Sequence, residues 1–302
     1  MQRREAQQIA RSVLAEVESR LPAADWRFEL LPQSQESVAV RLVRSDGASF
    51  VFKVAPHRYT DNDNDADLDF LRLYEQEHAI LTECALRGLP VPGAIDVFLS
   101  DVGLPVLLLD YVTHDGTKPG DEALGRLARQ LHEGDWDGWS TVAMRGLVTA
   151  DAVCGLILQR LAVVRRLTSG AIVLPPAGAL ADMLEPISRV QKMLHLDLRA
   201  DNVLCIASRP CCLLDWANAM VGDPLLELAR VAEYGLLTDE FVRGYGDRSL
   251  MAQLETPLGL ACRLYTAAMM TVLFMSEIPD RENAAARLER LQTLLSRISF
   301  QR

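Results

Sequence analysis

Several features that mark common protein classes are missing from this chain. Its six cysteines show neither a CxxC pair nor the spacing of a zinc site, and the first residues, MQRREAQQIARSV, lack the apolar core of a signal peptide. Basic residues are scattered, and 31 Lys and Arg against 41 Asp and Glu give a net charge of −10. We therefore expect a cytoplasmic protein with reduced thiols and no nucleic-acid partner. The acidity would allow a cationic small-molecule partner, but it is also ordinary for a soluble protein.

A clean membrane-spanning segment is also missing. The longest nearly apolar stretch, Leu258 to Met275, is interrupted by Arg263 and carries two threonines, so it is borderline for a membrane span. We interpret it as a buried helix and expect no membrane partner. The 302 residues and the 49% hydrophobic content are enough for one large domain or two lobes around a substantial core.

The first part of the chain predicts a small sheet flanked by helices. Residues 5 to 20 have the spacing of an amphipathic helix that packs outside the sheet. Val38, Val40 and Leu42 alternate with Ala39, Arg41 and Val43, as in a strand with one buried face. A Ser45-Asp46-Gly47 turn and the run Phe50 to Val54 complete a hairpin. A helix is predicted from about Leu68 to Arg87, where Gly88-Leu89-Pro90 stops it, and Ile95–Leu99 and Pro105–Tyr111 are predicted strands.

Lys53 is the candidate phosphate-binding residue of this sheet. It lies between Phe52 and Val54 on an apolar strand, where a lysine is costly to desolvate unless it meets an anion. That anion could be the α/β-phosphates of a nucleotide, with a glutamate behind the lysine. Glu75 and Glu77 compete for this place, and we choose Glu77; the alternative is that lysine and glutamate are both surface charges.

Alternating carboxylates between Asp61 and Asp69 resemble a calcium-binding loop. The sixth position lacks glycine, and the twelfth is Arg72 instead of glutamate, so the match fails. We expect a solvated, acidic start of the following helix, where negative charge favours the helix dipole.

Beyond Gly116 the pattern is mostly helical. Helices are predicted over Glu122–His132, Ala152–Thr168, Leu180–Leu194 and Pro224–Tyr234, followed by two long C-terminal helices, the last at about Arg281–Ile298 with a leucine face for the core. The acidic residues of the last third are scattered at spacings that fit solvated helix faces: Asp223, Glu227, Glu233, Asp239 and Glu240.

The most informative motif is His195-Leu196-Asp197-Leu198-Arg199-Ala200-Asp201-Asn202, with Asp215-Trp216-Ala217 at the end of the next apolar run. A loop carboxylate, an amide five positions later and a second carboxylate after a short strand supply oxygens for a hydroxyl group and for Mg²⁺. This pattern indicates phosphoryl transfer.

With these motifs in order, residues 28 to 234 resemble the aminoglycoside phosphotransferase branch of the protein-kinase-like fold, which also includes choline, fructosamine and homoserine kinases. The resemblance is carried by Lys53, by Glu77 to Pro92, by the stretch Leu127 to His132, by His195 to Leu204, and by Leu213 to Trp216 with Gly222-Asp223-Pro224 after it. It implies an α+β, bilobal fold: an N-terminal antiparallel-sheet lobe with one key helix and the hinge in residues 1–112, and a larger, mainly helical lobe in residues 113–302.

The resemblance also implies roles for these residues. Asp197 would orient and deprotonate the acceptor hydroxyl, Asn202 and Asp215 would hold Mg²⁺, and Lys53 would grip the phosphates of ATP, with GTP possible. His195 is expected to brace the loop. Arg199 could neutralise charge on the transferring group, or it could form a salt bridge that stiffens the loop. The end of the buried strand, Leu109, Asp110, Tyr111 and Val112, is the predicted hinge that pairs with adenine.

The chain departs from the protein-kinase pattern in two places. Residues 31 to 37 contain no glycine where a phosphate loop would lie, so Ser34 and Ser37 are the predicted phosphate contacts. Trp216-Ala217 replaces Phe-Gly, and no activation segment follows, which argues against a protein kinase. The implied activity is phosphorylation of a small-molecule hydroxyl, first of an antibiotic or related natural product; a primary metabolite kinase and an inactive nucleotide-binding pseudokinase are the alternatives. The pattern selects neither the acceptor nor the oligomeric state.

Overall fold

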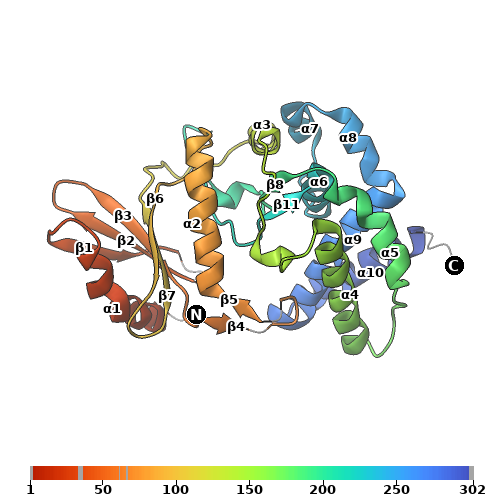
Figure 1. Cartoon of the computed structure of the whole chain (residues 1–302), viewed down its shortest axis with the longest axis horizontal. Coiled ribbons are helices and arrows are strands. Elements are labelled where there is room, and N and C mark those ends of the chain that lie inside the picture. Colours follow the sequence, from red (N-terminus) through yellow and green to blue (C-terminus); the bar gives the residue numbers. More distant parts are fainter. Residues whose placement is uncertain (1–2, 33–36, 61, 66, 299–302) are drawn as a thin grey trace. The chain divides into compact units, whose positions relative to one another are not determined.

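The computed structural model describes residues 3–32, 37–60, 62–65 and 67–298 (Figure 1). The chain forms two compact units. Unit 1 comprises Met1–Thr60, Asp67–Thr117 and Val203–Ala217, and unit 2 comprises Asp61–Ala66, Lys118–Asn202 and Asn218–Arg302. The two units therefore differ from a continuous division at residue 112, because the chain enters and leaves each of them more than once.

Unit 1 is built on a five-stranded antiparallel sheet in the order β1-β2-β3-β7-β6. Its strands are β1 (Trp26–Leu30), β2 (Val38–Arg44), β3 (Ser49–Val54), β6 (Ala94–Leu99) and β7 (Pro105–Asp110). The predicted hairpin forms, and Gly47 takes a positive φ of 92° in its turn, a conformation that costs glycine little. The tight β2–β3 register fixes which side chains share a face.

Alternation along these strands separates an apolar face from a polar one. Valines and leucines of β2, β3 and β7 pack against helix α1 (Arg3–Ser19), which confirms the predicted amphipathic helix. The opposite face carries the register-aligned residues Ala39, Lys53 and Leu107. Helix α2 (Phe70–Leu86) packs on β6 and β7, and Asp69 caps it by accepting a hydrogen bond from the amide of Leu71. Two strands of two residues each, β4 (Tyr59–Thr60) and β5 (Leu68–Asp69), pair antiparallel before α2 begins.

A second hairpin completes unit 1. Strands β9 (Val203–Ile206) and β10 (Arg209–Leu213) pair antiparallel. The amide of Asp115 donates to the carbonyl of Cys205 at 3.1 Å, and the amide of Leu213 donates to the carbonyl of Pro90 at 2.7 Å. These bonds explain why residues 203–217 belong with the sheet although they follow the helical part of the chain.

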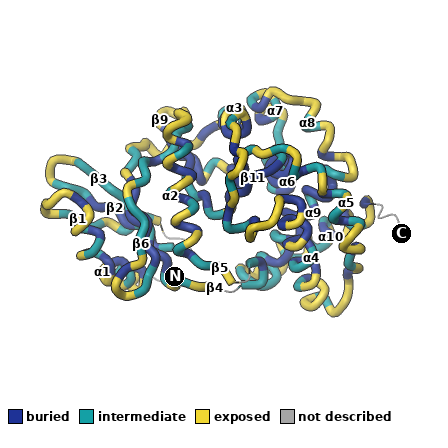
Figure 2. The backbone as a smooth tube through the Cα atoms, viewed as in Figure 1, coloured by how far each residue is buried: buried dark blue, intermediate teal, exposed yellow. Residues whose placement is uncertain are grey.

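Unit 2 is mainly helical. Its elements are α3 (Asp121–Glu133), η1 (Val142–Met144), α4 (Thr149–Leu167), α5 (Ala177–Leu184), η2 (Glu185–Ser188), β8 (Lys192–Leu194), η3 (Ala200–Asn202), β11 (Met220–Gly222), α6 (Pro224–Glu233), α7 (Asp239–Tyr245), α8 (Arg248–Ala252), η4 (Gln253–Glu255), α9 (Pro257–Val272), the π-helix η5 (Leu273–Glu277) and α10 (Arg281–Arg297). Within the described residues, the stretch Pro257–Glu277 is long and apolar enough to cross a membrane, and 67% of its apolar window is buried (Figure 2). It packs against α4, α6 and α10, as predicted for a buried helix.

Glycines permit the closest helix contact of unit 2. A Cβ atom at Gly125 of α3 would lie 2.1 Å from the carbonyl oxygen of Phe241, and one at Gly244 of α7 would lie 2.0 Å from that of Glu122. Helices α3 and α7 therefore pack backbone against backbone, and this contact fixes the position of His132 at the end of α3.

The predicted helix Leu180–Leu194 is wrong over its second half. Helix α5 ends at Leu184, a 3₁₀ turn follows, and Lys192–Leu194 form β8, which pairs with β11. Pro186 has no amide hydrogen to continue the α-helix, and pairing with a strand 26 residues later replaces the helical bonds.

The expectation of a solvated, acidic helix start at residues 61–69 is also wrong, apart from the cap formed by Asp69. Asp63 pairs with Arg166 at 2.5 Å and with the hydroxyl of Ser276. Asn64 is buried, and its backbone amide donates to Glu277 at 2.8 Å. The side chains of Asp63, Asn64 and Asp65 thus bind helices within unit 2.

Candidate active site

The predicted lysine–glutamate pair is formed in unit 1. Lys53 Nζ on β3 lies 2.8 Å and 3.1 Å from the two carboxylate oxygens of Glu77 on α2, and Glu77 is buried. Lys53 Nζ also lies 4.0 Å from Asp215 Oδ1. The choice of Glu77 over Glu75 is therefore confirmed, and Lys53 joins two carboxylates from distant parts of the chain.

The electrostatics of this group keep Lys53 charged. Burial alone would lower its pKa, but Glu77 and Asp215 outweigh burial and raise the pKa above its ordinary value. Tyr74, whose ring centre lies 5.6 Å from Lys53 Nζ, has its pKa raised by burial and stays a neutral phenol. The group thus presents a fixed ammonium, which suits an anionic ligand such as a phosphate.

Asp215 is presented by a short irregular segment after β10. Its φ of 68° lies in the left-handed region, which is strained for a non-glycine residue, and its side chain is 48% exposed. The next residue, Trp216, is fully buried, and its carbonyl accepts a hydrogen bond from Gln76 of α2 at 3.1 Å. Burial of Trp216 and the bond to Gln76 hold Asp215 in this conformation beside Lys53.

The predicted hinge residues lie at the end of β7. Leu109 is buried within the strand, and the amides of Asp110 and Tyr111 donate to the carbonyls of Gly93 at 2.8 Å and Ser49 at 3.3 Å. Val112 follows the strand, and its amide has no hydrogen bond within the part of the chain that is described. Of the four amides, that of Val112 is the one best placed to meet an adenine.

The two predicted serine contacts have different outcomes. Ser34 lies outside the described residues. Ser37 directly precedes β2, is partly buried, and its side chain interacts with that of Tyr74. A phosphate role for either serine stays a prediction.

Asp197 is the centre of a hydrogen-bonded group in unit 2. Its Oδ2 accepts a hydrogen bond from Asn202 Nδ2 at 2.7 Å, and the same nitrogen donates to the Asp197 carbonyl at 2.9 Å. The hydroxyl of Tyr234, at the end of α6, donates to Asp197 Oδ1 at 3.3 Å. Asp197 is therefore buried with each oxygen hydrogen-bonded to a neutral donor, and the Oδ1 of Asn202 remains directed away from that contact as a possible metal ligand.

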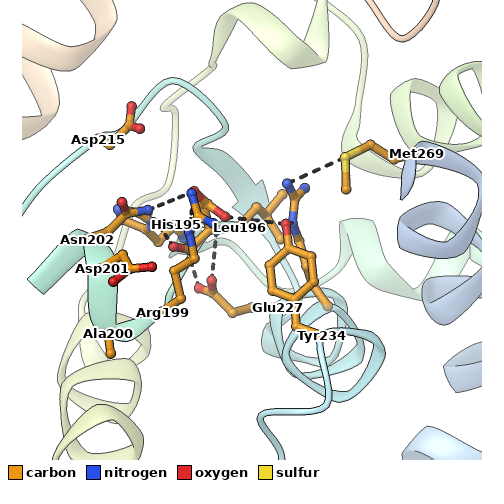
Figure 3. Close-up of polar contacts among 12 residues, drawn as sticks. His195, Leu196, Arg199, Ala200, Asp201, Asn202, Asp215, Glu227, Tyr234 and Met269 are labelled. Atoms are coloured by element: carbon orange, nitrogen blue, oxygen red, sulfur yellow. Dashed lines mark hydrogen bonds and ion pairs between the residues drawn. The ribbon is translucent and has the colours of Figure 1, made fainter. Parts of the chain in front are cut away.

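Glu227 of α6 holds the backbone of the loop that carries Asp197. Its Oε2 accepts from the amide of His195 at 2.8 Å, and its Oε1 accepts from the amide of Leu196 at 2.7 Å (Figure 3). Leu196 has a φ of 52°, so this loop is locally strained. His195 Nδ1 accepts from the amide of Asp197 at 3.2 Å, which confirms the predicted bracing role of His195.

A buried chain of polar groups extends from Glu227 to α7. His132 Nε2 lies 3.1 Å from Glu227 Oε2, and His132 Nδ1 lies 3.0 Å from the hydroxyl of Tyr245. Burial would raise the pKa of Glu227, but the hydrogen bonds and charge of its histidine neighbours and the loop amides outweigh burial and lower it. Glu227 therefore remains a carboxylate that can accept four hydrogen bonds.

The interpretation of the later acidic residues as solvated helix faces is wrong for the most important ones. Glu227 is fully buried, and Glu233 is buried with Arg263 and Arg290, each 2.6 Å from its Oε1. Asp223 caps α6 by accepting from the amide of Leu225. Asp239 and Glu240 are exposed in the first turn of α7, as expected. The spacing of Glu227, Arg230 and Tyr234, three and four residues apart, was a signal that these residues share one helix face.

Arg199 shows the second of its two predicted roles. Its Nε lies 3.3 Å from Asp197 Oδ2, and its side chain is 49% exposed. This ion pair stiffens the loop. A contact with a transferring phosphoryl group stays a prediction.

The predicted metal ligands provide one amide oxygen and one carboxylate. Mg²⁺ prefers such oxygen donors and usually keeps waters and substrate phosphates as its other ligands. Among the described residues, no group of three or more His, Cys, Asp or Glu is arranged to hold a metal ion, so a site built by protein ligands alone is not formed there. A metal that arrives with a nucleotide and is bound by Asn202 and Asp215 stays a prediction.

Comparisons with known proteins identify the family and the fold. A sequence model described as the phosphotransferase enzyme family matches residues 27–261. Comparison with curated proteins finds no match.

A thermostable mutant of aminoglycoside phosphotransferase APH(4)-Ia, in a ternary complex with AMP-PNP and hygromycin B, is 16% identical with a TM-score of 0.63, covering 95% of this chain and 98% of that chain. A putative fructosamine-3-kinase from Haemophilus somnus 129PT is 14% identical with a TM-score of 0.64, covering 96% and 97%. A streptomycin–ATP–APH(2")-IIa complex is 14% identical with a TM-score of 0.56, covering 93% and 95%. At these identities the likeness shows the fold, and the predicted α+β kinase-like fold is confirmed.

Proposed function

This chain belongs to the phosphotransferase enzyme family, and we propose that it transfers the γ-phosphoryl group of ATP to a hydroxyl group of a small molecule. The observation that carries the proposal is the buried carboxylate of Asp197, oriented by Asn202 and Tyr234 on a loop whose backbone Glu227 fixes. Phosphoryl transfer depends mainly on positioning and on stabilising charge. Both requirements favour a rigid loop of this kind.

In the proposed reaction, the acceptor hydroxyl gives its proton to Asp197 as its oxygen forms the new bond to phosphorus. The bond between the γ-phosphorus and the bridging oxygen breaks, and ADP leaves with that oxygen. Lys53, held charged by Glu77, binds the phosphates of the nucleotide. Asn202 and Asp215 would hold Mg²⁺, which when bound neutralises charge on the phosphates.

The acceptor is proposed to be a natural product or a metabolite with a free hydroxyl group. Two of the similar structures contain hygromycin B or streptomycin, which supports an antibiotic, and the fructosamine-3-kinase likeness supports a metabolite. Phosphorylation of an antibiotic would give resistance or self-protection. The six cysteines are free thiols, which supports the proposal that the protein works in the cytoplasm.

Transfer from labelled ATP to a panel of antibiotics, sugars, amino alcohols and hydroxy acids tests the proposal. We expect Mg·ATP to raise the melting temperature and at least one acceptor to be labelled. Stabilisation by Mg·ATP with neither transfer nor slow hydrolysis would support the pseudokinase alternative. Absence of any Mg·ATP effect on stability or hydrolysis would contradict the proposal.

A further inference from the structure

A buried arginine lies directly behind the proposed catalytic carboxylate. Arg230 of α6 is 4% exposed, and its Nε donates to the hydroxyl of Tyr234 at 3.0 Å; that hydroxyl in turn donates to Asp197 Oδ1. The nearest partner of Arg230 Nη2 is the sulfur of Met269 on α9, at 3.9 Å, which is a weak acceptor (Figure 3). Arg230 Nη1 has no hydrogen bond within the described residues. Most of the guanidinium is therefore without a strong acceptor.

A second buried arginine forms fewer hydrogen bonds. Arg160 of α4 is 3% exposed, and its Nε and Nη1 have no hydrogen-bond partner in the described part of the chain. Its Nη2 lies 3.5 Å from Asp65, at the limit of a hydrogen bond, and its guanidinium lies 4.8 Å from the ring centre of Tyr265 on α9. Burial lowers the pKa of Arg230, but Tyr234, Asp197 and Tyr265 outweigh burial and raise it. Arg230 and Arg160 therefore share Tyr265 as a neighbour.

Other arginines of unit 2 are paired directly with a buried carboxylate. Arg263 and Arg290 both bind the buried carboxylate of Glu233 at 2.6 Å. Around Arg230 and Arg160 the carboxylates are less directly placed: Asp65 lies 3.5 Å from Arg160 Nη2, and Arg230 is linked to Asp197 through the hydroxyl of Tyr234. Burying a guanidinium with so little direct pairing is costly, and a ligand that supplies an anion would offset that cost.

We propose that the acceptor is a small hydroxyl compound that carries an oxyanion, a carboxylate or a phosphate, which Arg230 and Arg160 bind. This inference rests on the proposed function and names its acceptor class. Asp197 repels an anion, so the hydroxyl lies at Asp197 while the oxyanion lies at the arginines, which gives the acceptor a direction. A polycationic aminoglycoside has the wrong charge for this place.

Matched pairs of acceptors test the proposal: hydroxy acids against their amides, and sugar phosphates against the free sugars, with labelled ATP and with aminoglycosides included. We expect the wild type to prefer the anionic member of a pair at least about tenfold in kcat/KM, since hydrogen bonds between charged groups are strong. Arg230→Met and Arg160→Met should lose that preference, and Arg230→Lys should keep part of it. Arg263→Met is the matched control, because it removes a partly buried guanidinium of α9 that is paired with Glu233, and it should leave the preference unchanged.

A binding measurement covers the case in which no acceptor of the panel is labelled. Inorganic phosphate and acetate are titrated in the presence of saturating Mg·ADP, and the melting temperature is read for wild type, Arg230→Lys, Arg160→Met and Arg263→Met. In the wild type we expect these anions to raise the melting temperature. This rise should be smaller in Arg230→Lys and Arg160→Met and should persist in Arg263→Met. Equal shifts in all four proteins, or labelling of neutral or cationic acceptors over anionic ones, would overturn the proposal. A missing response to Mg·ADP would instead contradict the proposed function, so the two failures are distinguishable.

Discussion

The two units arrange charge around their functional residues in different ways. In unit 1, Lys53 is paired directly with Glu77 and Asp215, so the group holds two carboxylates for one ammonium before any ligand arrives. In unit 2, Asp197 is oriented by an amide, a phenol and the exposed Arg199. Two buried arginines of the same unit, Arg230 and Arg160, have few strong acceptors. The first arrangement suits a ligand that brings its own cation, such as a metal nucleotide. The second suits a ligand that must be placed with one particular group at the carboxylate.

The sharpest test of this difference is Asp215→Ala in unit 1. We expect both the thermal shift with Mg·ATP and transfer to be lost, with kcat/KM lower by about a thousandfold or more, because a proposed metal ligand is removed. Asp101→Ala, an exposed carboxylate of the same unit, is the control. If Mg·ATP raised the melting temperature of Asp215→Ala as much as that of the wild type, Asp215 would not be one of the residues that bind the nucleotide.

Asp197→Ala in unit 2 should separate the two groups. Transfer should fall by roughly 10²–10⁴-fold, as for loss of a general base, while the Mg·ATP shift stays that of wild type. Steady-state transfer and differential scanning fluorimetry measure the two effects. Transfer at the wild-type rate would show that the assignment of Asp197 is wrong.

Glu227→Gln tests whether the loop backbone must be held by a carboxylate. Glutamine can accept at one oxygen only, so we expect a loss of about 1–3 kcal/mol in unfolding free energy and a reduced kcat with little change in the KM for ATP. Urea denaturation and kinetics provide the measurements, with the exposed Glu240→Gln as control. Unchanged kcat would mean that the loop keeps its conformation without Glu227.

Gln76→Ala tests the support of Asp215 from α2. Loss of the bond to the Trp216 carbonyl should cost about 1 kcal/mol of stability and raise the KM for Mg·ATP modestly, since burial of Trp216 remains. The change in KM is the measurement that matters. An effect on kcat alone would show that Gln76 does not support nucleotide binding.

The smallest effect near neutral pH concerns two buried glutamates of unit 2. The pKa values of Glu227 and Glu233 are lowered in the folded chain, so their stabilisation is complete above the ordinary glutamate value of 4.5 and is lost as pH falls through the lowered values. We expect the unfolding free energy to decline below about pH 4.5 and to decline less steeply in Glu233→Gln. Parallel pH profiles for both proteins would contradict this origin of the acid sensitivity.

The sequence predicted the parts of the site that depend on local pattern. The alternation around Lys53 and the helix bearing Glu77 place both residues on facing elements, and the spacing of Asp197 and Asn202 fits one loop. Glu227 was misread because an acidic residue at helical spacing looks the same in solvent and in the core. The burial of Glu227 is favourable because His132 of α3 and the loop amides form hydrogen bonds with it.

The same limit applies to the secondary structure and to the arginines. Lys192–Leu194 became a strand because Met220–Gly222 lies alongside, a pairing that local periodicity does not contain. Arg160 and Arg230 could not be recognised as buried, because long-range packing of α9 covers them.

The interleaved path of the chain sets the order in which the protein can be completed during synthesis. The chain changes units after residues 60, 66, 117, 202 and 217. A nascent polypeptide therefore cannot place Asp215 beside Lys53 until the segment with Asp197 has already left the ribosome. No single cut yields either unit whole, and an exchange of unit 1 between relatives would have to carry residues 203–217 along with the sheet.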